Sequence, residues 1–139
     1  MKVISAAVLL ALATTEAAWG HHSFAMFDAS HEKSLTGTIR EFQWTNPHTW
    51  VWLDVPSASG SLLEEWGIEG MSPNFLGRRG WSKNTLQPGD KVTVVIHPLK
   101  DGSKGGSFLS VTLSDGNVMS MMGDGASAKV PDAGSAQPR

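Results

Sequence analysis

Residues 72–80, SPNFLGRRG, predict the element that decides the fold. Ser72 supplies a capping hydroxyl, Pro73 suits the first position of a helix, and Gly80 is placed to end one. The stretch therefore predicts a helix of one or two turns. A Pro-Gly-Asp turn follows at residues 88–90. The segments on both sides alternate in the manner of strands, so this helix interrupts a β-protein.

Alternating apolar and β-branched residues predict three strands before the helix and two after it. A slip in the alternation between Ile39 and Phe42 predicts a β-bulge in the first strand. Asn46-Pro47 predicts the turn into the second strand. The segments, including a short last strand, are residues 34–44, 48–55, 62–69, 91–97, 107–113 and 117–118.

This order of elements predicts an all-β fold, a small five-stranded OB-like barrel with a short helix between strands 3 and 4. An open antiparallel sheet or a small sandwich of the same strands is the alternative. The chain has no cysteine, which excludes disulfides, thiolate metal sites and a cysteine nucleophile. The domain must depend on its core, to which the five tryptophans after residue 20 are expected to contribute.

The first 20 residues have the three parts of a secretory signal peptide. A positive start at Met1-Lys2 precedes an apolar run over residues 3–13 and small residues at Ala18 and Gly20. The run is about half of the roughly 20 apolar residues that span a membrane, so we expect cleavage and no membrane span in the mature form. Cleavage is expected after Gly20, with Ala18 or His21 as alternatives. The protein is expected to be periplasmic or secreted.

The predicted organisation is a signal peptide at residues 1–20, the barrel at 21–118 and a disordered tail at 119–139. From Ser120 onward the composition is rich in Gly, Ala, Ser, Pro and Asp, which cannot bury enough apolar surface to order the chain. Residues 119–122, MSMM, are interpreted as the fraying end of the last strand, with a ligand set for a soft metal as the alternative. The net charge of −2 argues against nucleic acid as a partner.

Several motifs carry a resemblance to a known family. They are HHSF at 21–24, LTGT at 35–38, EFQWTNPH at 41–48 and GW at 80–81. Together they resemble DUF6152, a family of uncharacterised exported bacterial proteins, over residues 21–118. The WTNPH string is the most specific part. The resemblance implies a small exported β-protein and brings no established activity.

The histidines at the amino terminus expected after cleavage predict a metal site. Cleavage after Gly20 would leave His21 with a free α-amine beside its own imidazole, and His22 adds a second ring. Such nitrogen-rich ligand sets suit Cu(II) best among the divalent first-row metals. His48 and His97 are candidate further ligands. The alternative is that both terminal histidines are simply solvated.

The hairpin around His48 is also similar to periplasmic copper chaperones built on a small OB-like barrel. Those proteins hold Cu(I) with a histidine, two methionine thioethers and a nearby tryptophan, here Trp44, and soft thioethers favour Cu(I). The alternative is that His48 hydrogen-bonds locally as a turn residue. The candidate thioethers are Met26, Met71, Met119, Met121 and Met122.

Tryptophans around the first turn predict a second kind of site. Trp50 and Trp52 share one face of the second strand, and Trp44 and Asn46 lie at its corner. An exposed surface of these residues would bind an apolar small molecule or a periplasmic protein partner without metal. The alternative is that the helix or the terminal segments cover it.

An enzyme is the less expected class. The sequence holds no phosphate loop, nucleophile elbow or His-Glu-x-x-His pattern. Glu64, Glu65 and Glu69 on the third strand are interpreted as its solvated face, and catalysis there would need a pocket joining Glu65 or Glu69 to a histidine. We therefore expect an exported binding module, with copper as the first ligand and a metal-free module as the alternative.

Overall fold

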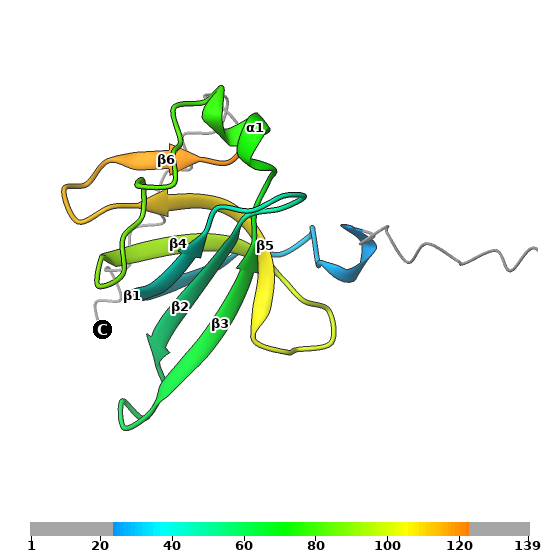
Figure 1. Cartoon of the computed structure of the whole chain (residues 1–139). Coiled ribbons are helices and arrows are strands. Elements are labelled where there is room, and N and C mark those ends of the chain that lie inside the picture. Colours follow the sequence, from blue (N-terminus) through cyan, green and yellow to red (C-terminus); the bar gives the residue numbers. More distant parts are fainter. Residues whose placement is uncertain (1–23, 123–139) are drawn as a thin grey trace, which may run out of the picture.

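The computed structural model describes residues 24–122. The predicted signal peptide, His21, His22 and residues 123–139 of the predicted tail lie outside this range, so what was predicted for them stays a prediction. The elements, shown in Figure 1, are a 3-10 turn η1 (Phe24–Met26), strands β1 (Lys33–Gln43), β2 (Trp50–Pro56) and β3 (Leu63–Glu69), helix α1 (Pro73–Gly77), and strands β4 (Lys91–Pro98), β5 (Gly105–Thr112) and β6 (Val118–Ser120).

The first five strands close into a barrel. Their order is β3-β2-β1-β4-β5, with antiparallel neighbours throughout. β5 then returns to β3 in a parallel pair between residues 105–107 and 67–69. This closure confirms the predicted OB-like barrel over the open sheet and the sandwich. The second half of β5 pairs with β6, which adds a short edge strand.

The predicted bulge lets β1 serve two neighbours. Its first half pairs with β4 from Lys33 to Thr38, and its second half pairs with β2. The register with β2 slips between Ile39 and Glu41, which confirms the bulge that the broken alternation predicted. A bulge bends a strand and increases its twist, so it helps the sheet to close.

The short helix begins as its capping signal predicts. The Ser72 hydroxyl accepts a hydrogen bond of 3.3 Å from the Phe75 amide, and Pro73 occupies the first helical position. Leu76 is fully buried, and Trp81 after the helix is buried as well. Helix α1 thus lies at one end of the barrel (Figure 1) and contributes to its core. Within residues 24–122, no helix is both long enough and apolar enough to cross a membrane.

The ordered domain extends past residue 118, so the predicted boundary of the tail is wrong for residues 119–122. Val118–Ser120 form β6, and Met121 is fully buried in the core. The Met121 amide also donates a hydrogen bond of 2.8 Å to the Leu109 carbonyl. The composition did not predict this order, because Met119 and Met121 are the only apolar side chains of the segment that pack against the core, and polar residues surround them. Pairing with β5 orders the segment.

Candidate functional site

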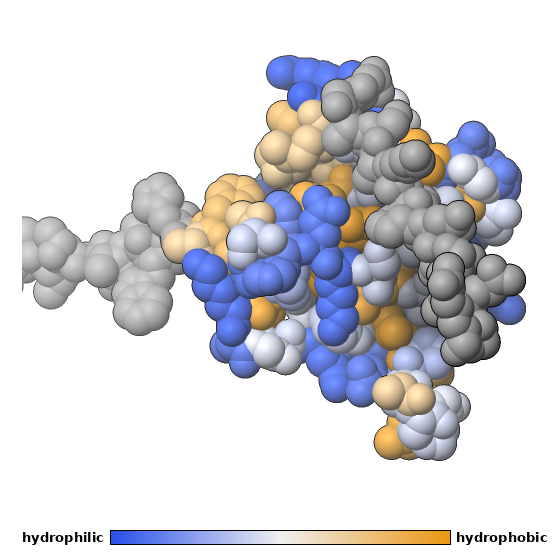
Figure 2. Space-filling view, turned by 180° about the vertical axis from the view of Figure 1, so that it is seen from behind, coloured by the Kyte–Doolittle hydropathy of each residue, from blue (hydrophilic) through white to orange (hydrophobic). Residues whose placement is uncertain are grey.

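A pocket of about 330 Å³ lies beside the junction of β3 and β5. The end of β3, the Gly70-Met71 segment that follows it and the middle of β5 form its walls. The 3-10 turn η1 approaches the same region, because the chain after it bonds to the β4–β5 corner through the Asp28 amide and the Pro98 carbonyl at 2.8 Å. Figure 2 shows apolar side chains gathered where the described chain begins. The apolar lining consists of Phe24, Phe27, Met71, Phe108, Leu109 and Met122.

Three polar side chains line the same pocket: Glu69, Ser107 and His97. Strand register places them in one row, since Ser107 pairs with His97 on β4 and with Glu69 on β3. Paired residues present their side chains on the same face, and neighbouring strands are about 4.8 Å apart. Glu69 and His97 therefore flank Ser107 at a backbone separation of about 10 Å.

Glu69 is buried, so the prediction that this glutamate belongs to a solvated face is wrong. Its side chain is 9% exposed, and its Oε1 accepts a hydrogen bond from Nδ1 of His48. The strand alternation places Glu69 on the outer face of the barrel, but the β1–β2 loop folds over it there. The alternation along β3 does not predict this burial, because the loop that covers Glu69 lies about 20 positions earlier in the chain.

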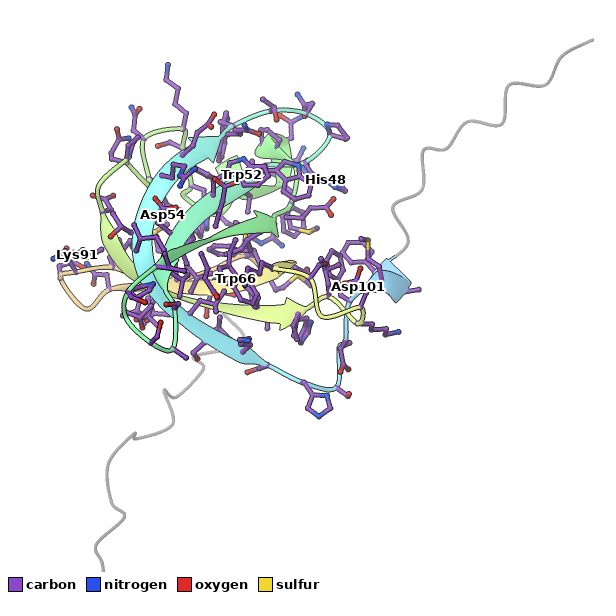
Figure 3. All side chains as sticks on the ribbon, turned by 90° about the horizontal axis from the view of Figure 1, so that it is seen from below. His48, Trp52, Asp54, Trp66, Lys91 and Asp101 are labelled. Atoms are coloured by element: carbon purple, nitrogen blue, oxygen red, sulfur yellow. The ribbon has the colours of Figure 1, made fainter. Side chains whose placement is uncertain are left out.

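The loop that carries His48 is tied to the pocket wall. Thr49 donates to the Met71 carbonyl from its amide at 3.1 Å and from its hydroxyl at 2.9 Å. The Gly70 amide returns a bond of 2.8 Å to the Thr49 carbonyl. Figure 3 shows His48 beyond the end of the strand that carries Trp52 and Asp54. The His48 ring does hydrogen-bond, but its partner Glu69 lies 21 positions away, so the bond is not the local one that the alternative expected.

The predicted metal ligands come together only in part. His97 lines the pocket, and His48 reaches its edge through Glu69. Among residues 24–122, no three His, Asp or Glu side chains converge closely enough to hold a metal ion. Met71 and Met122 add thioethers to the lining, while Met121 is enclosed in the core.

The predicted tryptophan surface is divided in two. Trp50 and Trp52 stack on the outer face of β2, with ring centroids 6.0 Å apart and planes at 18°. Gly67 makes room for this stack, because a Cβ there would lie 2.9 Å from the Trp52 ring. Trp44 instead packs edge-on against Phe42 at 5.6 Å and is half-buried against the core. Asn46 is exposed in the loop, before a cis bond to Pro47.

A charged cluster lies farther along the same outer face. Arg40 bonds Asp54 at 2.7 Å and also pairs with Glu65. The hydrogen bond to Asp54 is the main cause that raises the pKa of Arg40 above its ordinary value. Glu65 is half-exposed in this cluster, as expected for a solvated face, and its described partner is an arginine.

The pocket joins Glu69 to a histidine, which is the arrangement that catalysis at this glutamate would need. The hydrogen bonds of Glu69 nevertheless differ from those of a nucleophilic triad. In a nucleophilic triad the acid orients the base that contacts the nucleophile. Here Glu69 is hydrogen-bonded to His48, whereas the histidine beside Ser107 is His97.

Comparison with curated proteins and with solved structures found no match, and the predicted similarity to copper chaperones is not shown. A family model does match residues 8–109, which is more than half of the chain. That model describes a family of unknown function, DUF6152. It is the family that the HHSF, LTGT and WTNPH motifs indicated. The chain therefore belongs to the DUF6152 family.

Proposed function

We propose that this protein is an exported binding module that holds a small, mainly apolar molecule in the pocket beside β3 and β5. The observation that carries the proposal is the lining of this pocket. Six of its ten residues are apolar and three are polar. Small-molecule sites commonly combine a concave apolar wall with a few placed polar groups, in volumes of about 300 Å³ or more.

The rigid parts of the fold support a preformed site. Ser107, Phe108 and Leu109 belong to β5, and Glu69 ends β3, so barrel pairing fixes much of the wall. A preformed wall spares a ligand the entropic cost of ordering the protein. For a neutral aromatic of nine heavy atoms, about 0.5 kcal/mol per atom gives a Kd on the order of 1 mM.

Titration with 2-phenylethanol tests the pocket. We expect backbone NMR shifts at residues 70 and 107–109 that saturate with a Kd on the order of 1 mM. Ser107→Phe should fill the pocket and abolish these shifts. Ser59→Phe, in the exposed β2–β3 loop, is the matched control and should bind normally. Unchanged binding by Ser107→Phe in a folded protein would refute this location.

Export is the part of the proposal that rests on residues 1–20. Their charge, apolar run and small residues support a cleaved signal peptide. Mass spectrometry of the protein from a periplasmic fraction is expected to show a chain that begins at or near His21. A periplasmic product that retains residues 1–20, or no periplasmic product, would contradict export by this route.

Copper is the second candidate ligand, favoured by the chemistry around His97. This imidazole shares the pocket with the thioethers of Met71 and Met122, which are ligand types for copper. His21 and His22 lie outside the described residues, and their part in this candidate rests on the chelating chemistry of an α-amine and imidazole nitrogens.

The copper candidate predicts a strong dependence on the first residue. Protein that begins at His21 should bind Cu(II) tightly, and one extra residue before His21 should weaken binding strongly. His97→Ala should also weaken it, whereas His31→Ala, on the exposed lead-in, should not. Equal copper affinity in all four proteins would exclude both histidine sites.

A further inference from the structure

We infer that the molecule bound in this pocket carries a cationic amine that pairs with the carboxylate of Glu69. The inference rests on the proposed binding function and names the class of its ligand. Among residues 24–122, the pocket lining contains one acidic residue, Glu69, and one histidine, His97, but neither lysine nor arginine. An apolar pocket with a single buried carboxylate favours a cation, because an anion beside it would be both desolvated and repelled.

The hydrogen bonds of Glu69 leave one oxygen for a ligand. His48 approaches from the β1–β2 loop and binds Oε1. Within the described part of the chain, Oε2 has no hydrogen-bond partner, although the side chain is about nine-tenths buried. This oxygen is not fully enclosed, since it is not one of the described side-chain atoms that are both enclosed and without a hydrogen bond. An ammonium group in the pocket would therefore be able to donate a hydrogen bond to it.

The other lining groups suit the rest of such a ligand. Ser107, next to Glu69 in register, offers a hydroxyl that accepts a second N–H bond. Phe24, Phe27 and Phe108 line the same pocket, and ring faces attract a cation as well as an apolar body. The expected ligand is therefore an amphiphilic amine with an aromatic or aliphatic body about the size of one ring.

Three probes of nearly equal shape test the amine directly: 2-phenylethylamine, 2-phenylethanol and phenylacetate. We expect the wild-type protein to bind the amine at least about tenfold more tightly than the alcohol, which is 1.4 kcal/mol. Phenylacetate should bind most weakly. Titration of the full mature chain, followed by NMR or calorimetry, gives the three Kd values.

Glu69→Gln should remove the selectivity without removing the pocket. Its side-chain carbonyl still accepts from His48, so the alcohol should bind as before while the amine weakens to within about threefold of it. Glu65→Gln is the matched control on the same strand and face and should keep the full preference. If Glu69→Gln does not fold, the order of the three wild-type affinities still tests whether the pocket prefers an amine.

The outcomes separate the two proposals. If none of the three probes binds, the proposed function fails. If the alcohol and phenylacetate bind as tightly as the amine, the pocket stands and the inferred amine is wrong. Retention of the amine preference by folded Glu69→Gln would likewise overturn the role of Glu69.

Discussion

The hydrogen bond between His48 and Glu69 is expected to stabilise the barrel, because it satisfies a buried carboxylate. The Glu69 side chain is 9% exposed and that of His48 is 31% exposed. His48→Ala removes the donor and leaves Oε1 unpaired. Loss of one partner of a buried group costs about 1–3 kcal/mol. For a domain of this size, about 2 kcal/mol corresponds to a fall in Tm of roughly 10 °C.

The exposed pair between His31 and Asp28 provides a matched control. Its Nδ1-to-carboxylate distance is 2.7 Å, but the two side chains are 75% and 32% exposed. Because water replaces a lost partner at the surface, His31→Ala should leave the free energy of unfolding unchanged within error. Urea unfolding followed by tryptophan fluorescence measures both variants.

A double-mutant cycle isolates the buried pair from other effects of the substitutions. In the background of Glu69→Ala, His48→Ala should cost much less than it does in the wild type. The reasoning would be refuted if His48→Ala were as mild as His31→Ala, or if the two substitutions at residues 48 and 69 were additive.

Three further predictions test separate parts of the fold. Met121→Ala should lower the free energy of unfolding by about 2–5 kcal/mol, because the Met121 side chain is fully buried. If urea unfolding showed no effect, residues past 118 would lie outside the core. Gly67→Ala should displace the Trp52 ring, because the new Cβ would lie 2.9 Å from it. The substitution should lower the free energy of unfolding by about 1–3 kcal/mol and alter the near-ultraviolet circular dichroism. An unchanged spectrum would contradict the stacking of Trp50 on Trp52. Hydrogen bonds from Ser30, and after them the one from His31, lower the pKa of Asp28 from 3.8 to about 2. The stabilising effect of this carboxylate is therefore present above the unfolded pKa and is lost as the pH falls through about 2. NMR titration of Asp28 should give that midpoint, Ser30→Ala should raise it, and a midpoint near 4 in the wild type would refute the prediction.

The barrel strands and the helix could be predicted because their signals are local. Alternation along each strand records which face is buried, and the Ser72-Pro73 cap marks a helix start within two residues. The bulge was predictable for the same reason, since it breaks the alternation at the place where β1 changes partners. β6 was underestimated because its order comes from pairing with β5.

The candidate site was harder to predict because it depends on contacts between distant segments. His48 and His97 were identified by residue type alone, without Glu69, which hydrogen-bonds to His48 and lines the same pocket as His97. Glu69 lies on the outer face of β3, where alternation predicts solvent, and its burial depends on a loop about 20 residues earlier. Phe24 and Phe27 join the pocket because η1 folds back to the β4–β5 corner, a long-range packing event that no local pattern predicts.

The most direct test of the proposed site is to map 2-phenylethylamine onto the ¹⁵N-labelled mature protein by chemical shifts. The proposal predicts the largest shifts at Gly70, Ser107 and Leu109, around the pocket. They should saturate together with one Kd. Shifts centred on Trp50 and Trp52 would move the site to the tryptophan stack, and no saturable shifts at all would contradict the proposed binding function.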